Sequence, residues 1–73
     1  MKLRWTDSQD IAERLYALHP EQDPLEVRFT DLHSMVCRLS EFEDDPKLSN
    51  EAKLEAIQMA WLEEYQADDE SSD

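Results

Sequence analysis

The sequence predicts a mainly α-helical domain, and three observations point to this fold class. The 73 residues include no glycine, which disfavours an extensive antiparallel sheet, because tight hairpin turns need positive φ angles. Apolar residues recur at helical spacing in three separate segments. A chain of this length has room for one hydrophobic core. We therefore expect a single small domain over residues 1–66, followed by an acidic, disordered tail over residues 67–73.

The first helix is predicted to begin at Thr6, because Thr6 and Gln9 form the capping-box pattern of a helix start. The His19–Pro20 pair then ends the helical segment. Between these limits, the apolar residues follow the spacing i, i+4, i+7 of one helix face: Ile11, Leu15 and Leu18. We expect this face to be buried.

The second and third helices are predicted from the same two kinds of signal. Thr30 is the expected cap of the second helix, with Asp31 at its positive end, and Ser49 or Asn50 is the expected cap of the third. The apolar face of the second helix consists of Leu32, Met35, Val36 and Leu39. That of the third consists of Leu54, Ile57 and Trp61, and we expect this helix to lie at the centre of the core.

Two short stretches have the alternating pattern of a β-strand. Leu25, Val27 and Phe29 alternate with charged residues, and Leu3 and Trp5 alternate in the same way near the start of the chain. These stretches could pair as a short two-stranded β element, at most. The expected architecture is therefore a three-helix, winged-helix-like small domain.

The charge is strongly negative and unevenly distributed. The chain has 19 acidic and 7 basic residues, a formal net charge of −12, and most of the excess lies after residue 40. Phosphate groups would repel such a surface, so we expect no nucleic-acid partner. No apolar run approaches the ~20 residues that span a bilayer, and the residues before the first helix lack the apolar core expected of a secretory signal. We therefore expect a cytoplasmic monomer without a membrane partner.

The sequence offers no set of residues typical of an enzyme. Cys37 is the only cysteine, so no internal disulfide or multi-thiolate metal site can form. Its acidic surroundings disfavour a reactive thiolate. For His33, which follows Asp31 closely, a structural hydrogen bond is favoured over a role as metal ligand or base. Because no nucleophile, base and orienting group occur together, we expect no catalytic activity.

Four short motifs follow one another at close spacing. They are Leu-Arg-Trp-Thr-Asp-Ser at 3–8, Val-Arg-Phe-Thr-Asp-Leu-His at 27–33, Phe-Glu-Asp-Asp-Pro at 42–46 and Ser-Asn-Glu at 49–51. The combination resembles the IscX (YfhJ) family, whose small acidic proteins accompany bacterial iron–sulfur cluster assembly. The resemblance covers about residues 3–65 and implies a modified winged-helix fold. It also implies binding to the cysteine desulfurase of that system and weak binding of ferrous or ferric iron, as an iron adaptor or a regulator of sulfur transfer.

Acidic residues before the third helix form a candidate site for weakly bound iron. Glu41, Glu43, Asp44 and Asp45 fall within five residues, and Pro46 favours a loop there. Hard cations prefer oxygen ligands, but without imidazole or thiolate such a site is weak and exchangeable, so we expect no tightly bound cofactor. The alternative is a solvated loop that serves solubility. Two acids of the first helix are expected to supplement the site: Asp7 and Asp10.

Further acids are candidates for binding a partner protein. They are Glu13 in the first helix, Asp31 in the second, and Glu63 and Glu64 near the expected end of the third. An acidic surface of this kind favours docking on a basic surface, such as that expected of the desulfurase. An acidic decoy that occupies a basic, nucleic-acid-type groove without using metal would carry the same charge. The sequence leaves both interpretations open.

Overall fold

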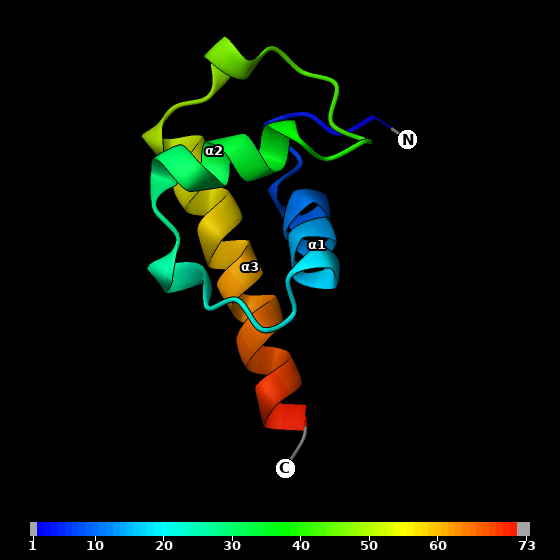
Figure 1. The fold of residues 1–73 in the computed structure, drawn as a ribbon, viewed down its shortest axis with the longest axis vertical. Coiled ribbons are helices and arrows are strands. Elements are labelled where there is room, and N and C mark those ends of the chain that lie inside the picture. Colours follow the sequence, from blue (N-terminus) through cyan, green and yellow to red (C-terminus); the bar gives the residue numbers. More distant parts are fainter. Residues whose placement is uncertain (1, 72–73) are drawn as a thin grey trace.

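The computed structural model describes residues 2–71, with side chains up to residue 67. Three α-helices dominate, and two short 3-10 helices precede α2 and α3, which confirms the predicted mainly α-helical class (Figure 1). The N-terminal segment lies beside the loop that links α2 to α3 (Figure 1). The elements are α1 (Ser8–Leu18), η1 (Pro24–Glu26), α2 (Phe29–Cys37), η2 (Pro46–Leu48) and α3 (Glu51–Ser71).

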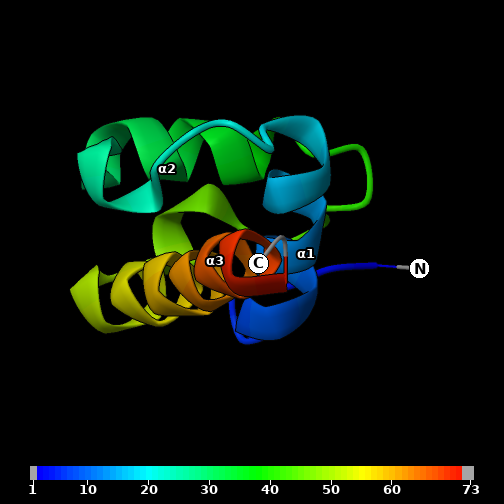
Figure 2. The same ribbon diagram turned by 90° about the horizontal axis from the view of Figure 1, so that it is seen from below.

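Helices α1 and α3 pack most extensively against one another. Helix α2 crosses the beginning of α3 (Figure 1), and it lies to one side of α3 when the molecule is seen from below (Figure 2). A side-chain hydrogen bond joins α1 to α3, from Gln9 Nε2 to Glu64 Oε1 at 2.9 Å. On another face of α3, Gln58 Nε2 donates to the carbonyl oxygens of Pro24 at 2.9 Å and Val27 at 3.4 Å. These bonds hold η1 against α3.

The predicted start sites of α1 and α2 are wrong by one or two residues. Helix α1 begins at Ser8, with Asp7 at the N-cap position and no side-chain capping bond, so Thr6 does not cap it. Helix α2 begins at Phe29 with Arg28 at the N-cap, which places Thr30 inside the helix. Before α1, the Asp7 carboxylate accepts a hydrogen bond from the Arg4 N–H, and in neither helix does the N-cap side chain make a capping bond.

Helix α3 begins where the sequence predicts. The Asn50 side chain accepts a hydrogen bond from the backbone N–H of Lys53 at 2.8 Å, as expected of an N-cap residue. The helix continues through residues 67–71, where the sequence indicates a tail. No glycine or proline interrupts this stretch, so no backbone feature forces the helix to end earlier. Residues 72–73 lie outside the described part of the chain.

One hydrophobic core joins the three helices and the N-terminal segment. Ile57 and Trp61 of α3 are fully buried at its centre, and the predicted faces of α2 and α3 supply much of the rest. Leu18 is an exception: it is the last residue of α1 and is 63% exposed. The core consists of Leu3, Trp5, Ile11, Ala12, Leu15, Leu32, Val36, Leu39, Leu54, Ile57 and Trp61.

The predicted pairing of two short strands is wrong. Residues 24–26 form η1 and Phe29 begins α2, so the alternating pattern at 25–29 does not form a strand. Leu3 instead forms an isolated parallel bridge with Phe42. The backbone N–H of Leu3 donates to the Glu41 carbonyl at 2.8 Å, and the N–H of Glu43 donates to the Leu3 carbonyl at 3.0 Å. The start of the chain therefore pairs with the loop before η2.

Candidate functional site: the acidic loop

The candidate site is centred on residues 41–46, which we call the acidic loop. The Leu3 bridge places the loop along the N-terminal segment, close to α1 and α2. Phe42, the apolar residue of the loop, packs against the core and meets the Trp5 ring edge-on, with 4.7 Å between ring centroids. The loop is thus attached to the domain by backbone pairing and by one aromatic side chain.

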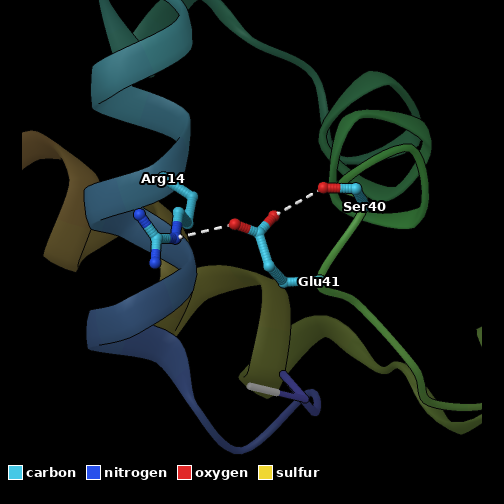
Figure 3. A network of polar contacts seen from close by, with 3 residues as sticks. All are labelled: Arg14, Ser40 and Glu41. Atoms are coloured by element: carbon cyan, nitrogen blue, oxygen red, sulfur yellow. Dashed lines mark hydrogen bonds and ion pairs between the residues drawn. The ribbon is translucent and has the colours of Figure 1, made fainter.

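Glu41 is held at the junction of the loop with α1. The Ser40 hydroxyl donates to Glu41 Oε1 at 3.0 Å, and Arg14 Nε lies 3.2 Å from Oε2. Figure 3 shows the Ser40 and Arg14 side chains on either side of the carboxylate. The Ser40 hydrogen bond, with the Arg14 charge acting in the same direction, lowers the pKa of the Glu41 carboxyl below its ordinary value. Its carboxylate therefore stays ionised and stabilises the junction.

Both carboxylate oxygens of Asp44 accept hydrogen bonds from backbone N–H groups of the protein. Oδ2 accepts a hydrogen bond from the backbone N–H of Trp5 at 3.1 Å, and Oδ1 accepts one from the N–H of Asp45 at 2.8 Å. These two donors, Trp5 first, lower the pKa of the Asp44 carboxyl, because hydrogen bonds to the charged form favour it. Asp44 therefore fastens the loop to the start of the chain.

The Asp45 carboxylate is also bonded within the protein, whereas that of Glu43 is not. Asp45 Oδ1 accepts a hydrogen bond from the backbone N–H of Lys47 at 2.9 Å and so caps η2. Glu43 is exposed, and its carboxylate makes no hydrogen bond or ion pair within the described part of the chain. Glu43 is thus the carboxylate of the acidic loop that is most available to a ligand.

The acids of α1 lie in two different settings. Asp7 Oδ2 accepts a hydrogen bond from the backbone N–H of Arg4 at 2.9 Å, which closes the turn before α1. Asp10 and Glu13 line a recess of about 200 Å³ together with Leu3 and Arg14. Arg14 of this recess also pairs with Glu41 of the acidic loop, whereas Asp7 does not line the recess.

The carboxylates predicted to hold iron do not converge on one point. Among the residues that the structure describes, no group of three or more histidine, cysteine or acidic side chains is arranged to hold a metal ion. Three of the four loop carboxylates accept hydrogen bonds from the protein itself. The donor set therefore does not fit a resident metal centre.

The remaining acids predicted to bind a partner lie on three helices. Glu13 and Glu63 are exposed on α1 and α3, and Asp31 is exposed in the first turn of α2. Glu64 is only partly exposed and bonds to Gln9. Because α3 continues to Ser71, Glu63 and Glu64 lie within the helix, and their predicted position near its end is wrong.

Trp5 and His33 reach the acidic loop, although the sequence assigned neither of them to the site. The Trp5 indole N–H donates to the Asp45 carbonyl at 2.7 Å, and His33 Nε2 lies 2.8 Å from the Pro46 carbonyl oxygen. The hydrogen bond predicted for His33 is therefore present. Nearby, burial raises the pKa of the Cys37 thiol, which disfavours the reactive thiolate.

Comparison with known proteins decides the family. The model of the family described as "Iron-sulphur cluster assembly" matches residues 3–66. The chain belongs to this family, IscX (YfhJ). The matched residues of the IscX family model include the whole acidic loop, Trp5 and His33. An uncharacterized protein of Pseudomonas aeruginosa, PA3808, is 53% identical to the chain over 64 residues, which cover 88% of this chain and 97% of that protein.

Each helix of this IscX-family domain carries charged residues. In the described part of the chain, no helix combines the length and the apolar character needed to cross a bilayer. The 21-residue helix α3 is the longest, and acidic residues recur along it.

Proposed function

We propose that the chain is a non-catalytic accessory protein of iron–sulfur cluster assembly that binds the cysteine desulfurase through its acidic surface. Membership of the family supports a role in iron–sulfur cluster assembly. The choice of a basic protein surface as partner rests on the charge of this chain, −12 over 73 residues. A complementary basic surface accelerates association and fixes orientation.

The observation that carries this proposal is the lack of internal compensation for the negative charge. Within the described residues, Arg14 and Glu41 form the only ion pair between side chains. No acidic side chain in this part of the chain is buried. The field of the uncompensated carboxylates therefore extends into solvent, where it attracts a cationic surface.

Calorimetric titration of the purified desulfurase with this chain tests the proposal. We expect the affinity to fall by about tenfold or more between low and high ionic strength, because salt screens the charges. Glu43→Gln should weaken binding by about twofold to fivefold at low salt. Glu21→Gln, in the exposed segment between α1 and η1, is the matched control and should bind normally. Affinity that does not change with salt would contradict electrostatic docking.

We propose further that iron is a weakly held cargo of the acidic loop rather than a resident cofactor. The free carboxylate of Glu43 supports this, as do oxygen ligands that bind hard cations in an exchangeable manner. Anaerobic titration with ferrous ion should shift the NMR signals of Glu41, Glu43, Asp44 and Asp45 before all others. Uniform or absent shifts would contradict iron binding at this loop.

A further inference from the structure

Two ring systems lie directly beneath the acidic loop. Trp5, 1% exposed, stacks on His33 with 5.2 Å between ring centroids and 27° between the ring planes. Trp5 comes from the N-terminal segment and His33 from the middle of α2, so the stack joins two elements that are distant in sequence. We call Trp5 and His33 the loop clamp.

The loop clamp bonds to three consecutive residues of the acidic loop. The Trp5 backbone N–H donates to the Asp44 carboxylate at 3.1 Å, and its indole N–H donates to the Asp45 carbonyl at 2.7 Å. His33 Nε2 lies 2.8 Å from the carbonyl oxygen of Pro46. Because a carbonyl oxygen can only accept, His33 Nε2 carries the hydrogen and donates.

The second ring nitrogen of His33 has a partner that suits this tautomer. Cys37 Sγ lies 3.8 Å from His33 Nδ1, one helical turn further along α2. In the neutral imidazole with the hydrogen on Nε2, Nδ1 is an acceptor and the Cys37 thiol is the donor. Both nitrogens of the ring are then satisfied, and the imidazole is fixed in the orientation that reaches Pro46.

Apart from the loop clamp, the bonds to the carbonyls in the second half of the acidic loop are local. The Leu48 N–H donates to the Asp45 carbonyl at 3.0 Å. The Ser49 hydroxyl donates to the Pro46 carbonyl at 3.3 Å. Phe42 packs on the core at the first half of the loop, whereas Asp45 and Pro46 are exposed.

We propose that Trp5 and His33 are positioning residues that hold the acidic loop in the conformation that binds the partner. This inference rests on the proposed function. The two rings carry no carboxylate, and their role is to hold the carboxylates of the acidic loop in position.

Three substitutions distinguish the effect of losing the His33 hydrogen bond from the effect of losing side-chain volume. His33→Leu fills a similar volume but cannot donate to Pro46. His33→Gln retains a donor at a position close to Nε2. Gln58→Leu is the matched control, because Gln58 also bonds to backbone carbonyls but holds η1 instead of the acidic loop.

Two measurements are made on each variant. Amide hydrogen exchange of the full chain monitors the N–H groups of Glu43 and Lys47, which bond to Leu3 and Asp45. Calorimetry with the desulfurase at low ionic strength gives the affinity. For His33→Leu we expect faster exchange at both amides and an affinity loss of about threefold to tenfold, the usual effect of one lost hydrogen bond. His33→Gln should retain most of the exchange protection and most of the affinity. Gln58→Leu should change neither the exchange of these amides nor the affinity.

The outcomes are distinguishable. Unchanged exchange in His33→Leu would overturn the clamp, and faster exchange with unchanged affinity would overturn its role in partner binding. Equal loss in His33→Leu and Gln58→Leu would also overturn it, since the effect would then reflect general loosening of the fold. If the unmodified chain does not bind the desulfurase, the proposed function fails, whereas the exchange data still decide whether the clamp exists.

Discussion

The two tryptophans of the chain are buried to the same extent but serve different regions. Trp5 is 1% and Trp61 0% exposed. The indole N–H of Trp5 donates to a carbonyl of the acidic loop, whereas that of Trp61 has no hydrogen-bond partner in the described part of the chain. Trp61 therefore contributes by filling the core at the cost of an unsatisfied donor, while Trp5 also determines where a polar loop lies.

This difference indicates that one region of the chain mainly provides stability and the other mainly positions the acidic loop. Most residues of the hydrophobic core, Trp61 among them, lie on the three helices, and their burial offsets chain entropy. The region around Trp5 couples that core to the acidic loop by hydrogen bonds. Stability should therefore depend most on Trp61, and the position of the carboxylates most on Trp5.

The largest expected effect is that of removing the Trp61 ring. Trp61→Ala should lower the free energy of unfolding by about 3–5 kcal/mol, because a large cavity opens at the centre of the core. That is much of the ~5–15 kcal/mol typical of a natural domain. Urea denaturation followed by circular dichroism measures it. A smaller loss than that caused by Trp5→Ala would contradict the assignment of stability to the Trp61 region.

A milder pair of substitutions isolates the hydrogen bond. Trp5→Phe and Trp61→Phe remove the same atoms, but only the first removes a donor that is in use. We expect Trp5→Phe to accelerate amide exchange at Lys47, in the segment after the acidic loop, and Trp61→Phe to leave it unchanged while the fold is retained. Faster exchange at Lys47 in Trp61→Phe but not in Trp5→Phe would contradict the role of the Trp5 hydrogen bond.

The stability of the Trp5 region should also depend on pH. The pKa of Asp44 is lowered in the folded protein, so its contribution to stability is complete above the ordinary pKa of 3.8 and is lost as the pH falls through the folded-state pKa. Asp44→Asn, which retains an acceptor oxygen, should flatten the fall in stability below about pH 4. Glu43→Gln is the matched control in the same loop. Acid unfolding followed by circular dichroism gives the comparison, and identical curves for Asp44→Asn and the unmodified chain would contradict it.

The smallest effect concerns the exposed pair at the other end of the acidic loop. Arg14 and Glu41 have side chains 51% and 33% exposed, and solvent screens such pairs. A double-mutant cycle with Arg14→Gln and Glu41→Gln should give a small favourable coupling at low salt that disappears near 1 M salt. A coupling that persists at high salt would indicate that the pair is more shielded than its exposure suggests.

The fold was predictable where the signal is local. The faces of α2 and α3 follow from periodicity, and Asn50 caps α3 as expected. Leu18 has the correct spacing for the α1 face, but it is the last residue of the helix and is exposed. Thr6 carries a capping pattern, yet the turn closed by Asp7 and Arg4 places the start of α1 two residues later.

The candidate site was predictable only in part. The acidic loop is recognisable because its carboxylates are adjacent in sequence. Trp5 and His33 lie within motifs of the chain, but no spacing rule relates them to residues 45 and 46, since Trp5 is 40 positions from Asp45. The sequence also could not indicate that Asp44 and Asp45 use their carboxylates internally.

The sequence by itself determined three helices, the position of most core residues and a charge of −12 concentrated after residue 40, since helical period and composition are local properties. Only the tertiary structure decided that Leu3 pairs with Phe42 instead of with the segment at 25–29, and that Trp5 and His33 meet beneath the acidic loop. The physical reason is that backbone hydrogen bonding and ring stacking between distant segments depend on how the helices pack. That packing is set by the whole core at once.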